Sequence, residues 1–401
     1  MDKLFVVCAP GLEPFTAQEL VELGLLRGKP SSPLSKTGGI EGGPEGGVEF
    51  QGTLRDVYRA NLHLRTASRV LVRLGAFYAA AFPELVRKAG RLPWERYLAP
   101  GQPVALRVTC HKSRLYHSGA VAERVARAMG DRLGQLPPLQ KFNPQDGSSR
   151  EDDDTNLPQL ILVRLAHDHC TISVDTSGAL LHRRGYRQAV AKAPLRETLA
   201  AGMLMASGWD MTSPLLDPFC GSGAIPIEAA LMARRIPPGR TRRFAFMDWP
   251  NFDAAMWNVL LADSPLPSQT GEGLGVGAKI LASDRDAGAI KSAQANAERA
   301  GVADMIEFSC RAVSAIEPPS GPGWVVTNPP YGVRVSAGKD LRNLYAQFGN
   351  VLRAKCPGWH IAVLCDSVQL VHNTGLKFDE ARSIPLVNGG LKVRLSRGPA
   401  R

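Results

Sequence analysis

Apolar residues in the second half of the chain form short runs separated by helical patterns. The strand-like runs lie at 215–217, 279–284, 305–310, 324–327 and 361–365, and the helical patterns at 224–235, 286–300 and 339–354. Short apolar runs that alternate with amphipathic helices predict a parallel sheet covered on both faces. Asn388-Gly389-Gly390 predicts a closing antiparallel hairpin. We therefore expect an α/β fold over residues 177–401.

The first half of the chain has a mixed pattern of strands and helices. Its strand-like runs lie at 4–8, 48–50, 69–73, 104–110, 160–166 and 171–175, with helical patterns after Glu13, after Leu54 and over 120–129. This order predicts an α+β module over residues 1–176. Three stretches rich in Gly, Pro, Ser or Asp, at 28–47, 131–158 and 262–278, are expected to be surface insertions.

The charge of the chain points to a polyanionic partner. The formal net charge is +11 and the sequence pI is about 9.5. Nucleic acid is favoured over a membrane, because the chain contains no run of about 18 apolar residues. The start Met1-Asp2-Lys3 lacks the pattern of a cleavable leader, so we expect a cytoplasmic protein, with a monomer favoured.

The seven cysteines form no Cys-x-x-Cys pair, and we interpret them as reduced, mostly buried thiols. The nearest approach to a metal cluster is His167-Asp168-His169-Cys170. No second pair with ligand spacing accompanies it, so we expect a turn between two strands there and no metal.

A glycine loop follows the strand-like run at 215–217. It reads Asp217-Pro218-Phe219-Cys220-Gly221-Ser222-Gly223, and a strand that enters such a loop places a ligand over a helix N-terminus. No Lys-Ser/Thr follows the glycines, which excludes a P-loop, and Pro226 stands where a dinucleotide fingerprint has its third glycine. An ordinary strand-to-helix turn remains the alternative. Cys220 is expected to be a small packing residue.

Asp284 ends the next strand-like run, where an acidic residue can accept hydrogen bonds from two ribose hydroxyls. It lies much further from the glycines than the about 20 residues of a nicotinamide fold, which counts against NAD. Asp284 is also expected to cap the helix that begins near Ala287, an alternative role that is compatible with contact to a cofactor.

A second motif, Asn328-Pro329-Pro330-Tyr331, follows the run at 324–327. Together the two motifs resemble class I S-adenosylmethionine methyltransferases that modify exocyclic amino groups of bases. The resemblance implies S-adenosylmethionine as cofactor. Asn328 would offer its side-chain carbonyl, and Pro329 or the adjacent Pro330 a backbone carbonyl, to the two amino hydrogens. Tyr331 would offer a face on which an extruded base stacks.

Two basic segments are candidates for RNA contact. Lys112, Arg114 and Tyr116 lie in His111-Lys112-Ser113-Arg114-Leu115-Tyr116-His117, which resembles the signature of a THUMP domain, an RNA-binding module. Arg183, Arg184 and Arg187 lie in a later connector and would meet phosphates. The alternatives are a solvated turn for the first segment and a linker face for the second.

Over nearly its whole length the chain resembles the bacterial THUMP methyltransferases that make N2-methylguanine in large-subunit (23S) ribosomal RNA. The resemblance rests on Pro10-Gly11-Leu12-Glu13, Gly46-Gly47-Val48-Glu49-Phe50, the 181–187 connector and the two catalytic motifs. It implies a ferredoxin-like part and a THUMP domain (about 46–175) within an RNA-binding module at 1–176, and a Rossmann-like seven-stranded catalytic domain at 177–401.

One position departs from this family pattern. Relatives often carry an Asp after the third strand to meet the adenine amino group, whereas Arg311-Ala312-Val313 offers none. The resemblance then leaves the adenine contact to the backbone at Ala312 or to a neighbour.

Three alternatives to this function stay open. One is the same chemistry on tRNA guanine, and another is a non-catalytic RNA-binding or ribosome-assembly factor that keeps the fold. DNA adenine-N6 methylation also uses Asn-Pro-Pro-Tyr, although the THUMP-like half argues against it.

Overall fold

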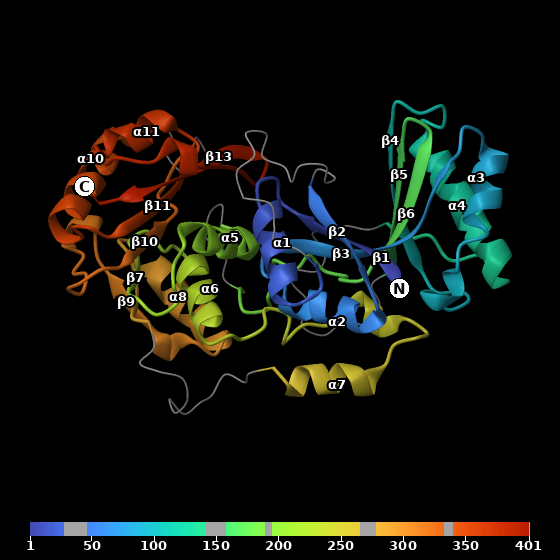
Figure 1. Cartoon of the computed structure of the whole chain (residues 1–401), viewed down its shortest axis with the longest axis horizontal. Helices are drawn as coiled ribbons and strands as arrows, with labels where there is room; N and C mark the ends of the chain where they lie inside the picture. The colour runs from blue at the N-terminus through green and yellow to red at the C-terminus, as the bar shows by residue number, and fades with distance from the viewer. Residues whose placement is uncertain (28–45, 142–157, 189–194, 265–277, 333–339, 401) are drawn as a thin grey trace.

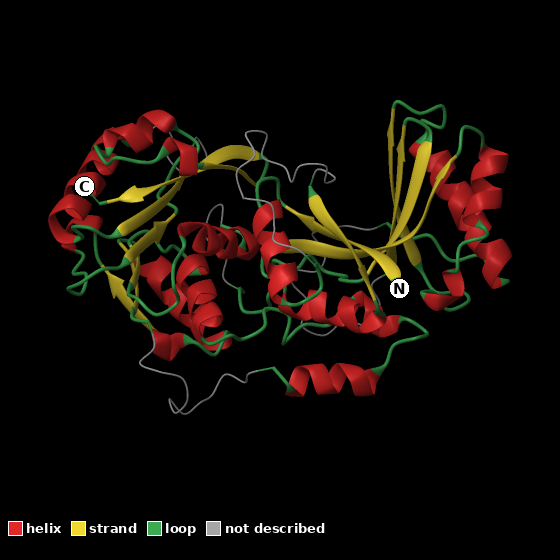
Figure 2. Cartoon of the chain, in the orientation of Figure 1, coloured by secondary structure: helices red, strands yellow, loops and turns green. Residues whose placement is uncertain are grey.

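The structure is a computed structural model that describes residues 1–27, 46–141, 158–188, 195–264, 278–332 and 340–400. Within these residues the chain forms two β-sheets, one in each half (Figure 1). Figure 2 shows that helices pack against both sheets. The predicted fold class, α+β elements followed by an α/β sheet, is confirmed.

The C-terminal sheet has seven strands among the described residues, in the order β12-β13-β11-β10-β7-β8-β9. Their bounds are β7 Leu215–Asp217, β8 Ile280–Asp284, β9 Ile306–Cys310, β10 Trp324–Thr327, β11 His360–Cys365, β12 Ile384–Asn388 and β13 Leu391–Pro399. Strands β7 to β11 are parallel, and the hairpin β12–β13 adds two antiparallel pairings next to β11. Strand order reverses between β7 and β10, and ligands bind at such a switch point in α/β folds.

The two faces of this sheet are buried because its strands are apolar on both sides. In β7, Leu215 packs into one apolar cluster and Leu216 into another. The first cluster takes in helices α5, α6 and α8, while α10 contributes to the second. The bounds of the helices are α5 Glu197–Ser207, α6 Ala224–Ala233, α8 Ala287–Arg299, α10 Arg342–Lys355 and α11 Val368–Asn373.

The N-terminal half contains one continuous sheet in the order β2-β1-β3-β6-β5-β4. Its elements are β1 Asp2–Cys8, α1 Glu13–Glu22, β2 Gly47–Gly52, α2 Leu54–His63, β3 Ala67–Tyr78, α3 Phe82–Ala89, β4 Val104–His111, α4 Ser118–Leu133, β5 Gln159–Ala166 and β6 His169–Asp175. The beginning of β3 pairs with β1, and its end pairs with β6. The sequence pattern predicted only 69–73 as strand here, so the structure extends it and joins the two N-terminal parts through it.

A segment from the C-terminal half of the sequence completes the core of the N-terminal half. This segment contains a short 3-10 helix, Ala245–Asp248, and helix α7, Ala254–Ala262. The Tyr58 ring of α2 stacks on Phe246 at 4.5 Å between centroids and meets Trp257 edge-on at 6.0 Å. The backbone N–H of Asp253 donates to the Tyr58 hydroxyl at 2.9 Å. The hydrophobic core of the N-terminal half therefore includes side chains from well beyond residue 176.

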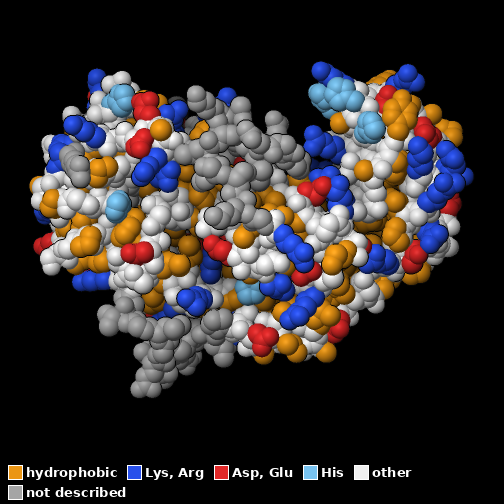
Figure 3. Space-filling model, viewed as in Figure 1, with side chains coloured by type: hydrophobic (Ala, Val, Ile, Leu, Met, Phe, Trp, Pro, Cys, Tyr) orange, Lys and Arg blue, Asp and Glu red, His pale blue; other side chains and the backbone are white. Residues whose placement is uncertain are grey.

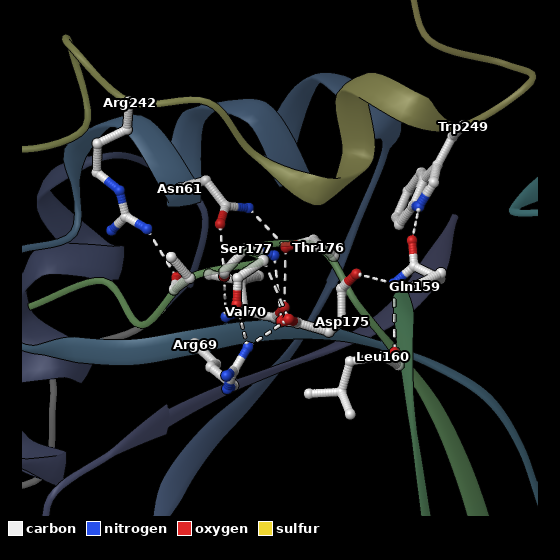
Figure 4. Close-up of polar contacts among 12 residues, drawn as sticks. Asn61, Arg69, Val70, Gln159, Leu160, Asp175, Thr176, Ser177, Arg242 and Trp249 are labelled. Atoms are coloured by element: carbon white, nitrogen blue, oxygen red, sulfur yellow. Dashed lines mark hydrogen bonds and ion pairs between the residues drawn. The ribbon is translucent and has the colours of Figure 1, made fainter. Parts of the chain in front are cut away.

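Buried polar contacts reinforce this junction (Figure 4). Arg69 pairs with the fully buried Asp175. The Trp249 indole donates to Gln159 Oε1 at 2.8 Å, and Gln159 Nε2 donates to the Asp175 backbone carbonyl at 2.7 Å. Since buried polar groups are costly when they lack partners, this chain of bonds ties the segment that follows α6 to β5 and β6.

Candidate active site

Three strand ends meet at the carboxyl edge of the C-terminal sheet. Asp217 ends β7, Asp284 ends β8, and Thr327 ends β10. The Asp217 side chain is buried and accepts hydrogen bonds from the Thr327 hydroxyl at 2.6 Å and from the Phe219 backbone at 3.2 Å. Burial raises the pKa of Asp217 to about 7, and the nearby charge of Asp284 contributes in the same direction.

The glycine loop is held between β7 and β8. Gly221 and Gly223 have φ values of +52° and +88°, which side chains other than glycine rarely adopt. A Cβ at Gly223 would lie 3.1 Å from the Cβ of Ala293, so this glycine allows α6 and α8 to pack closely. Cys220 is buried, and burial raises the pKa of its thiol well above the ordinary value. These facts fit the expected packing role of Cys220.

Asp284 faces the loop and does not cap a helix. Its Oδ2 accepts from the Gly221 backbone at 3.1 Å, and its Oδ1 accepts from the Asp286 backbone at 3.0 Å. The cap of α8 is Asp286, whose carboxylate accepts from the backbones of Gly288 and Ala289. The alternative role predicted for Asp284 is therefore wrong.

The arrangement fits S-adenosylmethionine. The Asp284 carboxylate is partly exposed beside the loop, and a Cβ at Gly221 would meet nothing within 4 Å, so there is open space where a ribose would approach. Pro218 is buried, whereas Phe219 packs edge-on against Phe348 at 5.5 Å. Ala312 lies exposed just after β9 and offers no side-chain hydrogen-bonding group.

Asn328 presents an unused acceptor at this edge. Its side-chain oxygen is buried and has no hydrogen-bond partner among the described residues. An unpaired buried oxygen of this kind calls for an explanation, because it costs about 1–3 kcal/mol. In the adjacent prolines, the carbonyl of Pro330 accepts from the Tyr345 hydroxyl at 3.2 Å. Within the part of the chain that the structure describes, the Asn328 oxygen thus keeps an unused acceptor.

Tyr331 is held from the C-terminal hairpin. The residue is 7% exposed, so little of it is open to the base predicted to stack there, and its hydroxyl accepts a hydrogen bond of 2.9 Å from the side-chain N–H of Asn388. Burial raises the pKa of Tyr331 to about 12. Sequence reasoning missed Thr327, Tyr345 and Asn388. Thr327 directly precedes the motif and was available as a signal, whereas the other two become neighbours only through the fold.

Lys112, Arg114 and Tyr116 lie together at an exposed tip of the N-terminal sheet. Lys112 and Arg114 are exposed, and Tyr116 is 79% exposed. The Arg114 guanidinium lies 3.8 Å from Asp168, in the turn that joins β5 to β6 as predicted. Figure 3 shows Lys, Arg and His side chains gathered at this tip, above the ends of β4 to β6. This exposed, basic position is compatible both with the predicted RNA contact and with a solvated turn.

The connector arginines are positioned differently. The Arg184 side chain is 2% exposed, lies 3.4 Å from Glu228 and donates to the Arg65 carbonyl at 2.6 Å. Arg187 pairs with Glu197 at 3.2 Å and has an 11% exposed side chain, and Arg183 is partly exposed. Burial therefore contradicts the predicted phosphate contact of Arg184, which instead links the two halves of the chain. Arg187 is likewise bound within the protein.

The described residues contain no cluster of three His, Cys, Asp or Glu side chains able to hold a metal ion. In the same residues, no helix has both the length and the apolar character needed to cross a membrane.

Comparison with known proteins agrees with this geometry. The RMKL-like methyltransferase domain matches residues 184–397, the RlmL ferredoxin-like domain residues 43–71, and the THUMP domain residues 79–175. A putative RNA methyltransferase from Synechocystis is 34% identical over 98% of this chain and 95% of its own length. A ribosomal RNA large subunit methyltransferase K/L from Syntrophotalea carbinolica is 34% identical over 98% of this chain. The chain spans 53% of that relative.

A solved structure extends the similarity to a cofactor product. SMU.472, a putative methyltransferase complexed with SAH, is 27% identical, with a TM-score of 0.80 over 99% of this chain and 97% of that one. The methyltransferase match covers over half of this chain, and the Synechocystis relative matches nearly end to end. The chain therefore belongs to the family of RMKL-like methyltransferases, which use S-adenosylmethionine.

Proposed function

We propose that this protein forms N2-methylguanine in RNA, with 23S ribosomal RNA as the substrate. The observation that carries the proposal is the buried, unpartnered side-chain oxygen of Asn328 at the carboxyl edge of the sheet. The names of the K/L relatives support ribosomal RNA as the substrate class.

The chemistry needs the exocyclic amine to become a better nucleophile. The amine lone pair is delocalised into the purine ring, so it attacks poorly unless it is directed away from the ring. Asn328 Oδ1 accepts one amino hydrogen and the Pro329 carbonyl accepts the other, since the Pro330 carbonyl already accepts from Tyr345. Two fixed acceptors orient the lone pair, and their gain is mainly electrostatic and positional.

The remaining residues hold the cofactor and the base. S-adenosylmethionine supplies an electrophilic methyl group on its sulfonium sulfur. The loop from Asp217 to Gly223 and the Asp284 carboxylate bind it, with a further contact at Ala312. Tyr331 supports the extruded guanine. Stacking of a base on an aromatic ring contributes about 1–3 kcal/mol.

The two halves of the chain divide the work in this proposal. Residues 1–176 hold structured RNA through the exposed tip that carries Lys112, Arg114 and Tyr116. Residues 177–401 carry catalysis. The protein acts as a monomer on RNA in the cytoplasm.

The proposal is tested with the whole chain, labelled cofactor and total RNA from a strain that lacks the protein. Labelled N2-methylguanine in 23S RNA, located by mass spectrometry of nuclease fragments, is the expected result. Label in tRNA would show that the substrate is tRNA and not 23S RNA. Cofactor binding without transfer to any RNA would identify a non-catalytic assembly factor, and transfer to DNA adenine would overturn the RNA proposal.

A further inference from the structure

The hairpin β12–β13 forms one edge of the C-terminal sheet, separated from β10 by β11, and its turn reaches the active site. Strand β13 is antiparallel to β11 and β12 is antiparallel to β13, so β12 runs in the same direction as β10. The carboxyl end of β12, at Asn388, therefore lies at the edge where β10 ends. The register pairs Asn388 with Leu391 across the turn, whose Gly389 and Gly390 have φ values of +58° and +89°. This tight turn fixes the backbone of Asn388.

Asn388 makes one directional contact with the catalytic loop. Its side-chain N–H donates to the Tyr331 hydroxyl at 2.9 Å. Tyr331 also belongs to an apolar cluster of buried residues, which restrains the ring without directional contacts. The hydrogen bond from Asn388 adds a directional restraint at the far end of the ring, because such bonds weaken steeply as their angle departs from linear.

The strand that carries Asn388 also abuts the N-terminal half. Gly11, in the turn between β1 and α1, has a φ of +91°, and a Cβ there would lie 2.2 Å from the Pro385 carbonyl oxygen and 2.9 Å from a methyl of Leu386. The turn therefore touches the backbone of β12 three residues before Asn388. The N-terminal half supports one side of the hairpin, and Tyr331 contacts its end.

We propose that Asn388 is a positioning residue that sets the orientation of the Tyr331 ring, and that the Gly11 turn aligns the hairpin with the RNA-binding half. This inference rests on the proposed function, in which Tyr331 receives the target base. The residue acts through Tyr331 and does not touch the reacting atoms. It places the base platform relative to the part of the protein that holds the RNA.

A double-mutant cycle tests the inference in the whole chain. Asn388→Ala removes the donor, and Tyr331→Phe removes the acceptor while keeping the ring. Each single variant should slow single-turnover methyl transfer about tenfold, because a small misplacement of a reacting group has large rate effects. The double variant should be no slower than either single variant, since both remove the same bond.

Three further measurements separate positioning from a general structural defect. Affinities for RNA and for S-adenosylmethionine should each stay within about twofold of wild type, so that the loss appears in the rate. Asn388→Asp keeps a residue that suits the turn and can accept from the Tyr331 hydroxyl, so it should restore most of the rate. Asn258→Ala, at an exposed position on α7, is the matched control and should change nothing.

Gly11→Ala probes the other end of the hairpin. Its Cβ would displace β12, so we expect slower transfer with unchanged cofactor affinity, and a smaller effect of Gly11→Ala in the Asn388→Ala background. Losses that simply multiply in the Asn388–Tyr331 cycle, while the wild-type chain is active, would overturn this inference alone. A wild-type chain that methylates no RNA would overturn the proposed function as well.

Discussion

The Thr327 hydroxyl donates a hydrogen bond of 2.6 Å to the buried Asp217 carboxylate, joining the ends of the two central strands β10 and β7. The bond links the residue before the Asn-Pro-Pro-Tyr loop to the residue that opens the glycine loop. The glycine loop and the Asn-Pro-Pro-Tyr loop are thereby held together at the carboxyl edge of the sheet.

Asp217→Asn should stabilise the protein at neutral pH. Burial raises the pKa of Asp217 to about 7, so the native state keeps a proton that the unfolded chain loses above about pH 4. The contribution of Asp217 to stability is therefore largest below pH 4 and is lost as the pH rises through 7. Asparagine cannot ionise, and it keeps the acceptor for Thr327. In urea unfolding without cofactor, the free energy of unfolding of Asp217→Asn should therefore exceed that of wild type by nearly zero at pH 4 and by roughly 2–4 kcal/mol at pH 8.

The control for this pH series is Asp263→Asn, which changes an exposed carboxylate at the end of α7. A stability difference between Asp217→Asn and wild type that does not vary with pH would show that Asp217 titrates normally. Asp217→Asn should also bind S-adenosylmethionine more weakly if the Asp217 charge contacts the cofactor.

Asp284→Ala should weaken S-adenosylmethionine binding by about 1.5–3 kcal/mol, through loss of charge-assisted bonds to the ribose. Isothermal titration calorimetry measures the change. Asp286→Ala is the matched control, because it removes a neighbouring carboxylate that caps α8 and does not face the loop. It should lower stability by about 1 kcal/mol and leave the affinity alone. Equal affinities for Asp284→Ala and wild type would remove Asp284 from the site.

Asn328→Ala should impair catalysis far more than binding. Losing one preorganised acceptor at the reacting amine typically costs about 100-fold to 1,000-fold in rate. Cofactor affinity should fall little, because Asp284 and the glycine loop remain. Single-turnover transfer to cognate RNA measures the rate, and a wild-type rate would defeat the mechanism. Tyr331→Ala should differ by raising the apparent substrate constant as well as slowing turnover.

Neutralising Lys112 and Arg114 should weaken RNA binding and flatten its dependence on salt. Each lost phosphate contact lowers the slope of log affinity against log salt by about 0.7–0.9. Lys279→Ala is a suitable control, because Lys279 is exposed and pairs with Glu307 near the start of strands β8 and β9, in the C-terminal half of the chain. An unchanged slope in the Lys112 and Arg114 double variant would show that the tip does not touch phosphates.

Arg184→Met should destabilise the fold by about 3–5 kcal/mol, because it leaves the buried Glu228 carboxylate without its charged partner, with only the Tyr186 hydroxyl donating to it. Urea unfolding measures this loss, with the exposed Arg55→Met as control. The salt slope of RNA affinity should match wild type for the folded protein. A lower slope together with wild-type stability would return Arg184 to the RNA-binding surface.

The catalytic sheet was predictable because its strands are buried on both faces and appear as short apolar runs. Asp217, Asp284 and Asn328 could be placed at one edge, since each follows such a run and the carboxyl ends of parallel strands coincide. The end of β3 was not predictable from the pattern, because Gly75 interrupts the apolar residues there and the last residues are mostly half-buried or exposed, without the alternation of a strand.

Contacts between distant segments account for the other misses. Arg184 looked like a solvated charge, yet its partners Glu228 and Arg65 lie 44 and 119 residues away. Asn388 looked like a turn residue, and its contact with Tyr331 spans 57 residues. Neither partner leaves a local signal, because a side chain's destination depends on how the sheets and the connector are placed in three dimensions.

The segment that contains Phe246 and Trp257 bears on the order in which the protein matures during synthesis. Chains emerge from the ribosome N-terminal end first, and domains generally fold as they appear. Tyr58 of α2 is covered by rings that are translated only after α6 of the catalytic half. Part of the aromatic core of the N-terminal half therefore stays uncovered until Trp257 has left the exit tunnel.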